Sequence, residues 1–156
     1  MRILLTVLLF STLAFDAAEN AAIPYPSGYR NWTHVKSTLI TSQHPRFDTN
    51  GGLHHFYANQ KALDGYRSGN FADGSILVDD LLELKEKEGV GAEGTRRRVA
   101  VMMKDSTKFK DTGGWGFEIF KGEETVASLN VDGKAACFAC HNKQKDHNLV
   151  YSSYRK

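Results

Sequence analysis

The sequence predicts an α+β fold, mainly an antiparallel β-sheet with a few short helices. Between residues 32 and 120, runs in which polar and apolar residues alternate recur several times, and this alternation is the period of a half-buried strand. Turn signals such as Asn50-Gly51-Gly52 and Asp73-Gly74 separate these runs. The chain has 156 residues, which suits one domain with a single core or pocket.

The elements can be predicted in order along the chain. Strands are expected over residues 32–42, 53–58, 75–84, 98–103 and 115–120. A short helix is expected over Gln60–Arg67, because Asn59 can cap its start and Ser68-Gly69 ends it. Residues 85–95 are charged and rich in glycine, so they are interpreted as a mobile loop between two strands of a hairpin.

Residues 1–22 have the features of a signal peptide. Met1-Arg2 is followed by an apolar run that is shorter than the roughly 20 residues needed to span a bilayer. Small residues recur after this run without a clear A-x-A pattern, so the cleavage site is left open. We therefore expect a single domain over residues 23–156, exported to the periplasm, with no membrane partner.

Charge gives no sign of a nucleic-acid partner. The formal net charge is +2, and the basic residues are scattered along the chain. The tight basic run Arg96-Arg97-Arg98 is interpreted as a solvated loop that enters a strand.

The most informative stretch is Cys137-Phe138-Ala139-Cys140-His141, the attachment pattern of c-type haem. Each thiol can add to one vinyl group of the porphyrin, and the spacing lets both sulfurs reach neighbouring vinyls. The histidine that follows is then placed under the iron as its proximal ligand. The sequence therefore predicts one covalent haem c, and we expect the motif to begin a short helix.

Two other interpretations of the motif were weighed. A redox disulfide of the thioredoxin kind needs a strand-to-helix turn inside a βαβ pattern, whereas this motif lies near the C-terminus with no later alternation of strand and helix. A zinc site would use both cysteines, His141 and His147, but structural zinc sites usually pair two separated ligand clusters. Haem is favoured over both.

The sixth iron ligand separates electron carriers from proteins that bind ligands. Met102 and Met103 are the internal methionine candidates, and both lie in an apolar strand where a core role is commoner. No methionine follows the haem motif. We therefore expect an open or water-occupied distal side.

Six short segments carry a resemblance to a known family. They are Tyr29-Arg30-x-Trp32, His54-His55-x-Tyr57, Gly69-x-Phe71-x-Asp73-Gly74, Lys104-Asp105-Ser106-x-x-Phe109, Gly114-Trp115-Gly116-Phe117 and Cys137-x-x-Cys140-His141. In this order they resemble the cytochrome P-460 family, from about residue 24 to residue 155. The resemblance implies a homodimer of β-sheet-dominated subunits, each with one c-type haem and a five-coordinate iron on His141.

Two positions distinguish the two branches of this family. In the hydroxylamine-oxidising branch, a lysine is crosslinked to the porphyrin and a distal glutamate handles protons. Alignment on Asp73-Gly74 places Asp79 at the lysine position, and alignment on Lys104 places Ala100 at the glutamate position. Aspartate has no nucleophilic amine and alanine cannot relay a proton, so the chain resembles the cytochrome c-prime-beta branch more closely.

That branch implies an apolar distal pocket capped by phenylalanines, which admits small neutral diatomics such as nitric oxide and carbon monoxide. The candidate distal residues are Phe56, with Phe47 and Phe71 behind it, His54, Asp79 and Ala100. His54 and His55 are adjacent on a predicted strand and would point to opposite faces, so at most one of them can face a pocket.

The sequence thus predicts a periplasmic mono-haem c-type cytochrome that binds, senses or buffers nitric oxide. One alternative is an enzyme, a hydroxylamine oxidoreductase or a weak peroxidase, in which Asp79 or His54 would supply acid-base function. A third possibility is a single-haem electron carrier that has Met102 or Met103 on the iron and a periplasmic redox partner.

Overall fold

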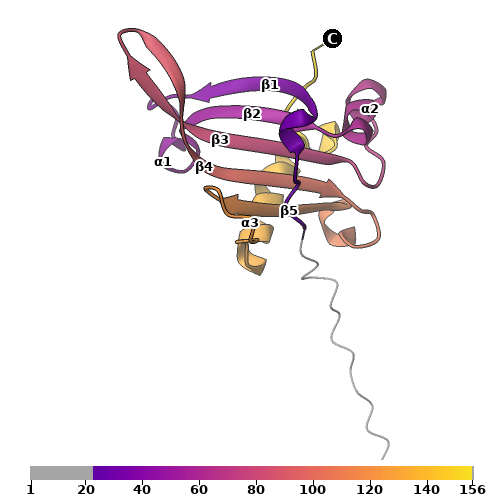
Figure 1. Cartoon of the computed structure of the whole chain (residues 1–156). Helices are drawn as coiled ribbons and strands as arrows, with labels where there is room; N and C mark the ends of the chain where they lie inside the picture. The colour runs from indigo at the N-terminus through magenta and orange to yellow at the C-terminus, as the bar shows by residue number, and fades with distance from the viewer. Residues whose placement is uncertain (1–22, 156) are drawn as a thin grey trace, which may run out of the picture.

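The computed structural model describes residues 23–155, so the predicted signal peptide at 1–22 lies outside the described residues. Five strands form one sheet in chain order: β1 (Thr33–Ile40), β2 (Gly52–Ala58), β3 (Ile76–Lys87), β4 (Val90–Lys104) and β5 (Trp115–Lys121). Each strand pairs antiparallel with the next one in the chain (Figure 1). The predicted antiparallel sheet is confirmed.

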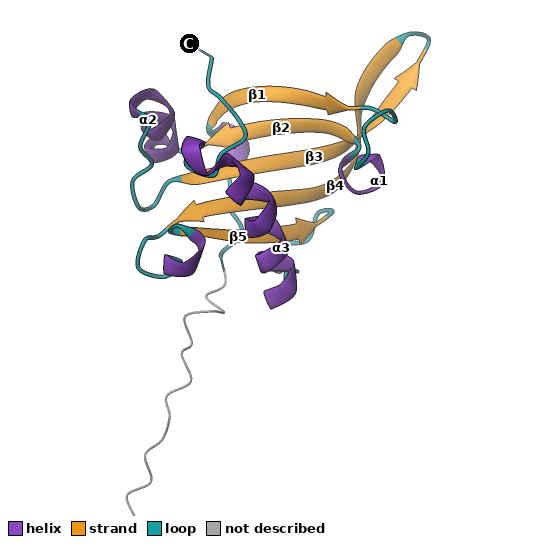
Figure 2. Ribbon diagram, turned by 180° about the vertical axis from the view of Figure 1, so that it is seen from behind, coloured by secondary structure: helices purple, strands orange, loops and turns teal. Residues whose placement is uncertain are grey.

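Short helices surround this sheet. They are α1 (Phe47–Asn50), α2 (Gln60–Ser68) and α3 (Val131–His141), with 3-10 segments at Tyr29–Asn31, Lys110–Thr112 and Asn142–His147. Figure 2 shows α3 lying across one face of the sheet, with α1 and α2 near opposite ends of the strands. Within residues 23–155, no helix combines the length and the apolar character that a membrane span needs.

The helix α2 begins where the sequence predicts and ends at Ser68, one residue after the predicted end. The Asn59 side chain accepts a hydrogen bond from the backbone N–H of Ala62 at 2.9 Å. Gly69 follows the helix in the left-handed conformation, with φ of 78°.

The strands β3 and β4 are longer than the sequence predicts. The prediction of a mobile loop over residues 85–95 is therefore wrong. Lys85 pairs with Ala92 and Lys87 pairs with Val90, so strand pairing continues to a tight turn at Glu88 and Gly89. Both turn residues have positive φ, 52° and 80°, as a type I′ hairpin turn requires. This end of the hairpin extends beyond the rest of the sheet (Figure 1), so it has no buried face to produce an alternating pattern.

The helix α3 places the cysteine motif differently from the sequence prediction. The motif ends the helix at His141 and does not begin one. Asn130 caps the start of α3, because its side chain accepts a hydrogen bond from the N–H of Gly133 at 2.8 Å. The helix therefore begins several residues before the motif, whose side chains occupy its last turns.

Apolar residues are buried on both faces of the sheet. On the face that α3 covers, the cluster contains Val35, Ala58, Ala62, Phe71, Leu77, Met102, Trp115, Phe117, Leu149 and Val150. On the opposite face, Ile23 and Tyr29 pack against Val78, Val99, Val101 and Phe120. The N-terminal segment therefore covers one face, while α3 and the C-terminal tail cover the other.

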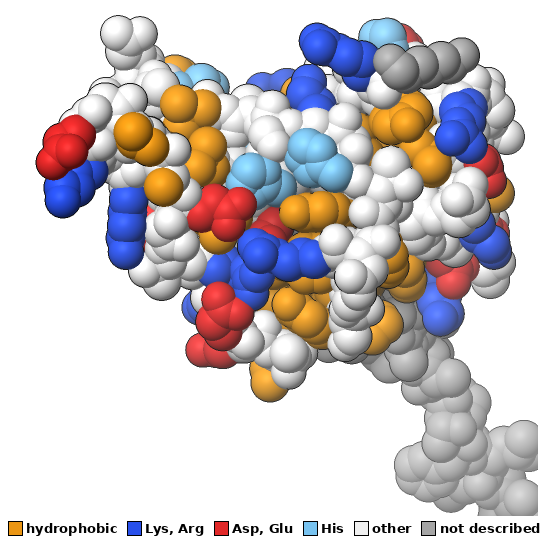
Figure 3. All heavy atoms as spheres, turned by 45° about the horizontal axis from the view of Figure 1, so that its top comes forward, with side chains coloured by type: hydrophobic (Ala, Val, Ile, Leu, Met, Phe, Trp, Pro, Cys, Tyr) orange, Lys and Arg blue, Asp and Glu red, His pale blue; other side chains and the backbone are white. Residues whose placement is uncertain are grey.

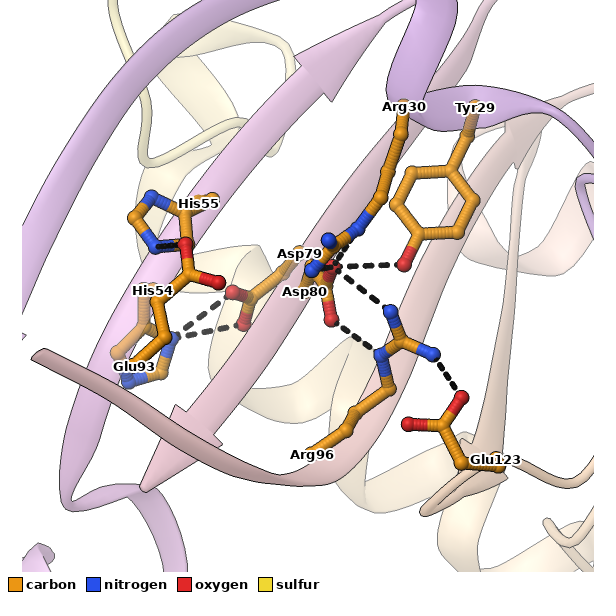
Figure 4. A network of polar contacts seen from close by, with 9 residues as sticks. All are labelled: Tyr29, Arg30, His54, His55, Asp79, Asp80, Glu93, Arg96 and Glu123. Atoms are coloured by element: carbon orange, nitrogen blue, oxygen red, sulfur yellow. Dashed lines mark hydrogen bonds and ion pairs between the residues drawn. The ribbon is translucent and has the colours of Figure 1, made fainter. Parts of the chain in front are cut away.

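A buried carboxylate joins the N-terminal segment to the sheet. Asp80 is 0% exposed and accepts hydrogen bonds from Tyr29 Oη at 2.7 Å, Arg30 Nη2 at 2.8 Å and Arg96 Nε at 2.8 Å (Figure 4). Arg96 also pairs with Glu123. Figure 3, a view that includes the side of the sheet opposite α3, shows histidine, acidic and basic side chains gathered close together.

Candidate haem site

A cavity of about 720 Å³ lies between the sheet and the end of α3. Its volume is within the range of sites for small molecules and cofactors. Cys137, Cys140 and His141 line it from α3, and the C-terminal tail contributes Val150, Tyr151 and Ser152. The sheet contributes Phe56, Asp79, Ala100, Met102 and Phe117, among others. The cysteine motif therefore faces a cavity between the sheet and α3.

His141 is held as the neutral imidazole with its proton on Nδ1, which is the form that can bind a metal through Nε2. Its Nδ1 lies 2.7 Å from the carbonyl oxygen of Leu149, which can only accept a hydrogen bond, so Nδ1 carries the proton. Burial lowers the pKa of His141, which favours the neutral imidazole. The rings of Phe117 and Tyr151 flank it at 5.1 and 5.3 Å between centroids. The lone pair on Nε2 is therefore available to iron. The hydrogen bond from Nδ1 to Leu149 is the kind that metal-bound histidines usually make with their other ring nitrogen.

Both cysteines are free thiols with different surroundings. Burial raises the pKa of Cys137. Burial alone would also raise the pKa of Cys140, but hydrogen bonds with Arg46 Nη1 at 3.1 Å and Tyr151 Oη at 3.6 Å lower it below its usual value. The two sulfurs are not bonded to each other, as attachment of each to a separate vinyl group requires.

The zinc interpretation finds no support in the structure. Among residues 23–155, no group of three or more His, Cys, Asp and Glu side chains is placed to hold a metal ion. His147 lies in the 3-10 segment after α3 and is not part of the cavity wall.

The residues present therefore fit a c-type haem. Two thiols and a histidine at the end of one helix face a cavity of sufficient size, and the histidine has a free Nε2. When bound, the haem supplies an iron that can bind small ligands and change its oxidation state. Cys137 and Cys140 would hold the porphyrin, and His141 would hold the iron. The fold and the site define a c-type haem protein.

The comparison with protein families agrees with this assignment. The model of the cytochrome P-460 family matches residues 26–152, so the chain belongs to this family of haem proteins. A comparison with curated proteins finds no match.

The wall of the cavity across from α3 contains four of the six candidate distal residues. Phe56 pairs with Asp79, and Asp79 pairs with Ala100, so the three side chains lie in one row on the same face of β2, β3 and β4. His54 lies two residues before Phe56 and lines the same cavity. The small side chain of Ala100 leaves space beside the carboxylate of Asp79.

The structure does not bring Phe47 and Phe71 to the cavity wall. Phe71 is 6% exposed and packs edge-on against Trp115, with 5.5 Å between ring centroids. It belongs to the core beside α2. Phe47 is 39% exposed and begins the short helix α1. Only Phe56 among the three candidate phenylalanines therefore lines the cavity.

His54 and Asp79 form a buried ion pair on the cavity wall (Figure 4). His54 is 4% exposed, and its Nδ1 lies 2.9 and 3.0 Å from the two carboxylate oxygens of Asp79. Its Nε2 lies 2.7 Å from the carbonyl oxygen of Asn50. Burial alone would lower the pKa of His54, but Asp79 and the Asn50 carbonyl raise it above its usual value.

The two adjacent histidines of β2 point to opposite faces, as the sequence predicts. His55 pairs with Asp80 on the face away from the cavity, and its Nε2 lies 3.0 Å from a carboxylate oxygen of Glu93. Of the two, only His54 lines the cavity.

Arg98 is a cavity residue that the sequence analysis missed. Its Nη1 donates to the carbonyl of Thr49 at 2.7 Å, and its Nη2 donates to Asn50 Oδ1 at 2.8 Å. Its Nε is buried and has no hydrogen-bond partner within the described part of the chain. The interpretation of Arg96 and Arg97 as part of a solvated loop is wrong, because both lie in β4, which begins well before Arg98, where the sequence predicts the strand to start.

A β-bulge explains why the side chains of Arg96 and Arg98 lie on opposite faces of the sheet. Leu81 pairs with Arg98, whereas Leu82 pairs with Arg96, so β4 has one extra residue at this point. Arg96 and Arg98 would share a face in a regular strand. With the bulge, Arg96 reaches Asp80 on one face and Arg98 lines the cavity on the other.

The two candidate methionines also face opposite sides of the sheet. Met102 lines the cavity and packs with Leu77 and Phe117 in the core under α3. Met103 packs with the cluster on the other face. Only Met102 is on the side of the sheet that an iron ligand would need.

Proposed function

We propose that this protein is a mono-haem c-type cytochrome with a five-coordinate iron on His141, which binds small gaseous ligands such as nitric oxide and carbon monoxide. In this respect it would resemble the cytochrome c-prime-beta branch of its family. The observation that carries the proposal is the state of His54 on the opposite wall. Both of its ring nitrogens are engaged, by Asp79 and by the Asn50 carbonyl, so neither is free to bind iron. On the same wall, the small side chain of Ala100, which pairs with Asp79, leaves space for a small ligand.

Export to the periplasm is part of the proposal. It is supported by the charged and apolar N-terminal sequence and by the covalent haem, whose attachment in bacteria is completed outside the cytoplasmic membrane. A homodimer is proposed on the resemblance to the family alone.

Titration of the ferrous holoprotein with nitric oxide and with carbon monoxide tests the proposed function. We expect each gas to form a one-to-one adduct and to change the absorption spectrum with isosbestic points. Met102→Leu serves as a control, because Met102 lines the same cavity and should not alter the unliganded spectrum. A protein that binds neither gas, and that gains gas binding in Met102→Leu, would instead be an electron carrier with methionine on the iron.

A second candidate function is a haem-dependent oxidoreductase acting on hydroxylamine, or a weak peroxidase. The buried His54–Asp79 pair favours it, because an acid-base pair inside the cavity can move protons to or from a substrate. Steady-state assays with hydroxylamine and with hydrogen peroxide distinguish it from simple ligand binding. Turnover that is lost in Asp79→Asn would support the enzyme, whereas binding of gases without turnover would contradict it.

A further inference from the structure

We propose that Arg98 is the counter-ion of a haem propionate, one of the two carboxylate side chains of the porphyrin. The inference rests on the candidate haem site and not on the ligand that binds the iron, so it goes beyond the proposed function. The propionates lie on the edge of haem opposite the two vinyl groups, which Cys137 and Cys140 would hold. A carboxylate that enters a cavity needs a compensating charge, because an unpaired buried ion is costly.

The guanidinium of Arg98 is fixed on the cavity wall, and part of its hydrogen-bonding capacity is unused. Its Nη1 donates to the carbonyl of Thr49 at 2.7 Å and its Nη2 donates to Asn50 Oδ1 at 2.8 Å, so α1 holds the group in place. A guanidinium has five N–H groups, and these two contacts use two of them. The Nε is buried and has no partner among the described residues. Burial lowers the pKa of Arg98, as expected for an enclosed cation with too little compensating charge.

Asp79 does not supply the missing charge, because it forms a neutral pair with His54. The carbonyl of Asn50 can only accept a hydrogen bond, so its contact of 2.7 Å with His54 Nε2 requires a proton on that nitrogen. The contacts of 2.9 and 3.0 Å between Nδ1 and the two Asp79 oxygens require a second proton, on the nitrogen or on the carboxylate. The pair has a net charge of zero with either placement, so it does not neutralise Arg98.

Glu118 is the other carboxylate that lines the described cavity wall, and it has partners of its own. Its Oε1 accepts hydrogen bonds from the backbone N–H groups of Ile119 at 3.0 Å and Leu129 at 2.9 Å. Its Oε2 lies 3.7 Å from Lys134 Nζ, and both side chains of this ion pair are mostly buried. Glu118 therefore compensates Lys134 and not Arg98.

The remaining basic side chains of the cavity wall do not have the same need. Arg46 and His44 are exposed, so water screens any charge that they carry. Arg46 also donates a hydrogen bond to Cys140 Sγ at 3.1 Å. His141 is neutral, with its proton on Nδ1. Within the described cavity wall, Arg98 is therefore the positive side chain that is mostly buried and has no counter-charge.

A haem carboxylate suits this position better than an anion from solution. Covalent attachment to α3 would keep the carboxylate beside the sheet at all times, whereas a free anion would have to bind from dilute solution. The planar guanidinium of arginine matches both oxygens of a carboxylate. Its charge is delocalised, so a carboxylate beside any of its edges compensates it.

Resonance Raman spectroscopy of the ferrous holoprotein tests the pairing, because one bending band belongs to the propionates and falls in frequency when their hydrogen bonds weaken. We expect Arg98→Gln to shift this band to lower frequency. Arg97→Gln is the matched control, because Arg97 is the adjacent arginine and is not among the residues that line the cavity. It also donates two hydrogen bonds to backbone carbonyls, of Gly51 at 2.6 Å and of Asp48 at 2.7 Å. The control should leave the band unchanged.

The reduction potential of the haem gives a second readout, which does not depend on the Raman band. Ferric haem carries one more positive charge than ferrous haem, so loss of a nearby cation stabilises the ferric state and lowers the potential. We expect the potential to fall in Arg98→Gln and to stay near the wild-type value in Arg98→Lys, which keeps the charge. Arg98→Lys should still shift the Raman band, because an ammonium does not match both oxygens of a carboxylate. This variant also tests the pairing if Arg98→Gln fails to take up haem.

The possible results distinguish this inference from the proposed function. A propionate band that is the same in the wild type, Arg98→Gln and Arg98→Lys would overturn the pairing, even in a protein that binds nitric oxide and carbon monoxide. Equal shifts in Arg98→Gln and Arg97→Gln would also overturn it, since both variants would then act through α1. A wild-type potential that falls on addition of phosphate, with no difference in the band between variants, would assign Arg98 to a free anion instead. A lower band and a lower potential in Arg98→Gln, with neither change in Arg97→Gln, would support the pairing, and gas titration would still decide the proposed function.

Discussion

Replacement of both Cys137 and Cys140 by serine is expected to abolish covalent haem retention completely. These are the only two cysteines in the chain, and both line the cavity with His141. Serine has a similar shape but cannot form a thioether with a vinyl group. The measurement is the mass of the denatured protein, in which the wild type should carry one haem and the double variant none.

His147→Ala is the control for this prediction. His147 is the histidine that a zinc site would need, and it is not among the residues that line the cavity. We expect this variant to retain its haem in the same amount as the wild type. Haem that remains on the denatured double variant, or one equivalent of zinc in the wild type, would contradict the assignment.

Replacement of Asp80 by alanine is expected to lower the free energy of unfolding by about 3–5 kcal/mol. Asp80 is fully buried and accepts hydrogen bonds from Tyr29, Arg30 and Arg96. Its removal leaves Arg96, which is itself mostly buried, without its main counter-charge. Urea unfolding of the holoprotein at neutral pH measures the loss.

Asp64→Asn is the control, because Asp64 is a carboxylate that is paired with an arginine but is not buried. Asp64 pairs with Arg67 at 3.2 Å on the surface of α2, and both side chains are exposed. Such a pair contributes only about 0–1 kcal/mol, so this variant should unfold almost as the wild type does. Equal losses in both variants would contradict the role assigned to the buried carboxylate.

The contribution of Asp80 should also depend on pH. Burial alone would raise the pKa of Asp80, but its hydrogen bonds with Arg96, Tyr29 and Arg30 hold it below the usual value. A lowered pKa means that the stabilisation is present above the unfolded value of about 3.9 and is lost as pH falls through the folded value. The difference in free energy of unfolding between the wild type and Asp80→Ala should therefore shrink in acid.

Most of the fold was predictable because most strands have one buried face. Alternating residues located β2 and β5 closely, and the capping signals of Asn59 and Gly69 located α2. The far end of the β3–β4 hairpin gave no such signal, because its residues are largely exposed on both faces. Pairing between strands, which a local pattern does not contain, extends the hairpin to Glu88 and Gly89.

The cysteine-histidine motif of the candidate haem site could be recognised in the sequence because haem attachment would fix the spacing of its residues along the chain. The opposite wall was predictable only in part, since it depends on which side chains the sheet brings together. The row of Phe56, Asp79 and Ala100 follows from strand register, and the place of Arg98 depends on a bulge that no local pattern indicates. The polar character of this wall comes from the contact between His54 and Asp79, which are far apart in sequence.

The most direct test of the central claim is an absorption spectrum of the purified ferrous protein, followed by mass spectrometry of its haem peptide. We predict the spectrum of a five-coordinate, high-spin c-type haem, attached only through Cys137 and Cys140. A strongly red-shifted Soret band with a third bond between protein and porphyrin would contradict this account. A lysine would then be crosslinked to the haem, and hydroxylamine oxidation would replace gas binding as the function to assay.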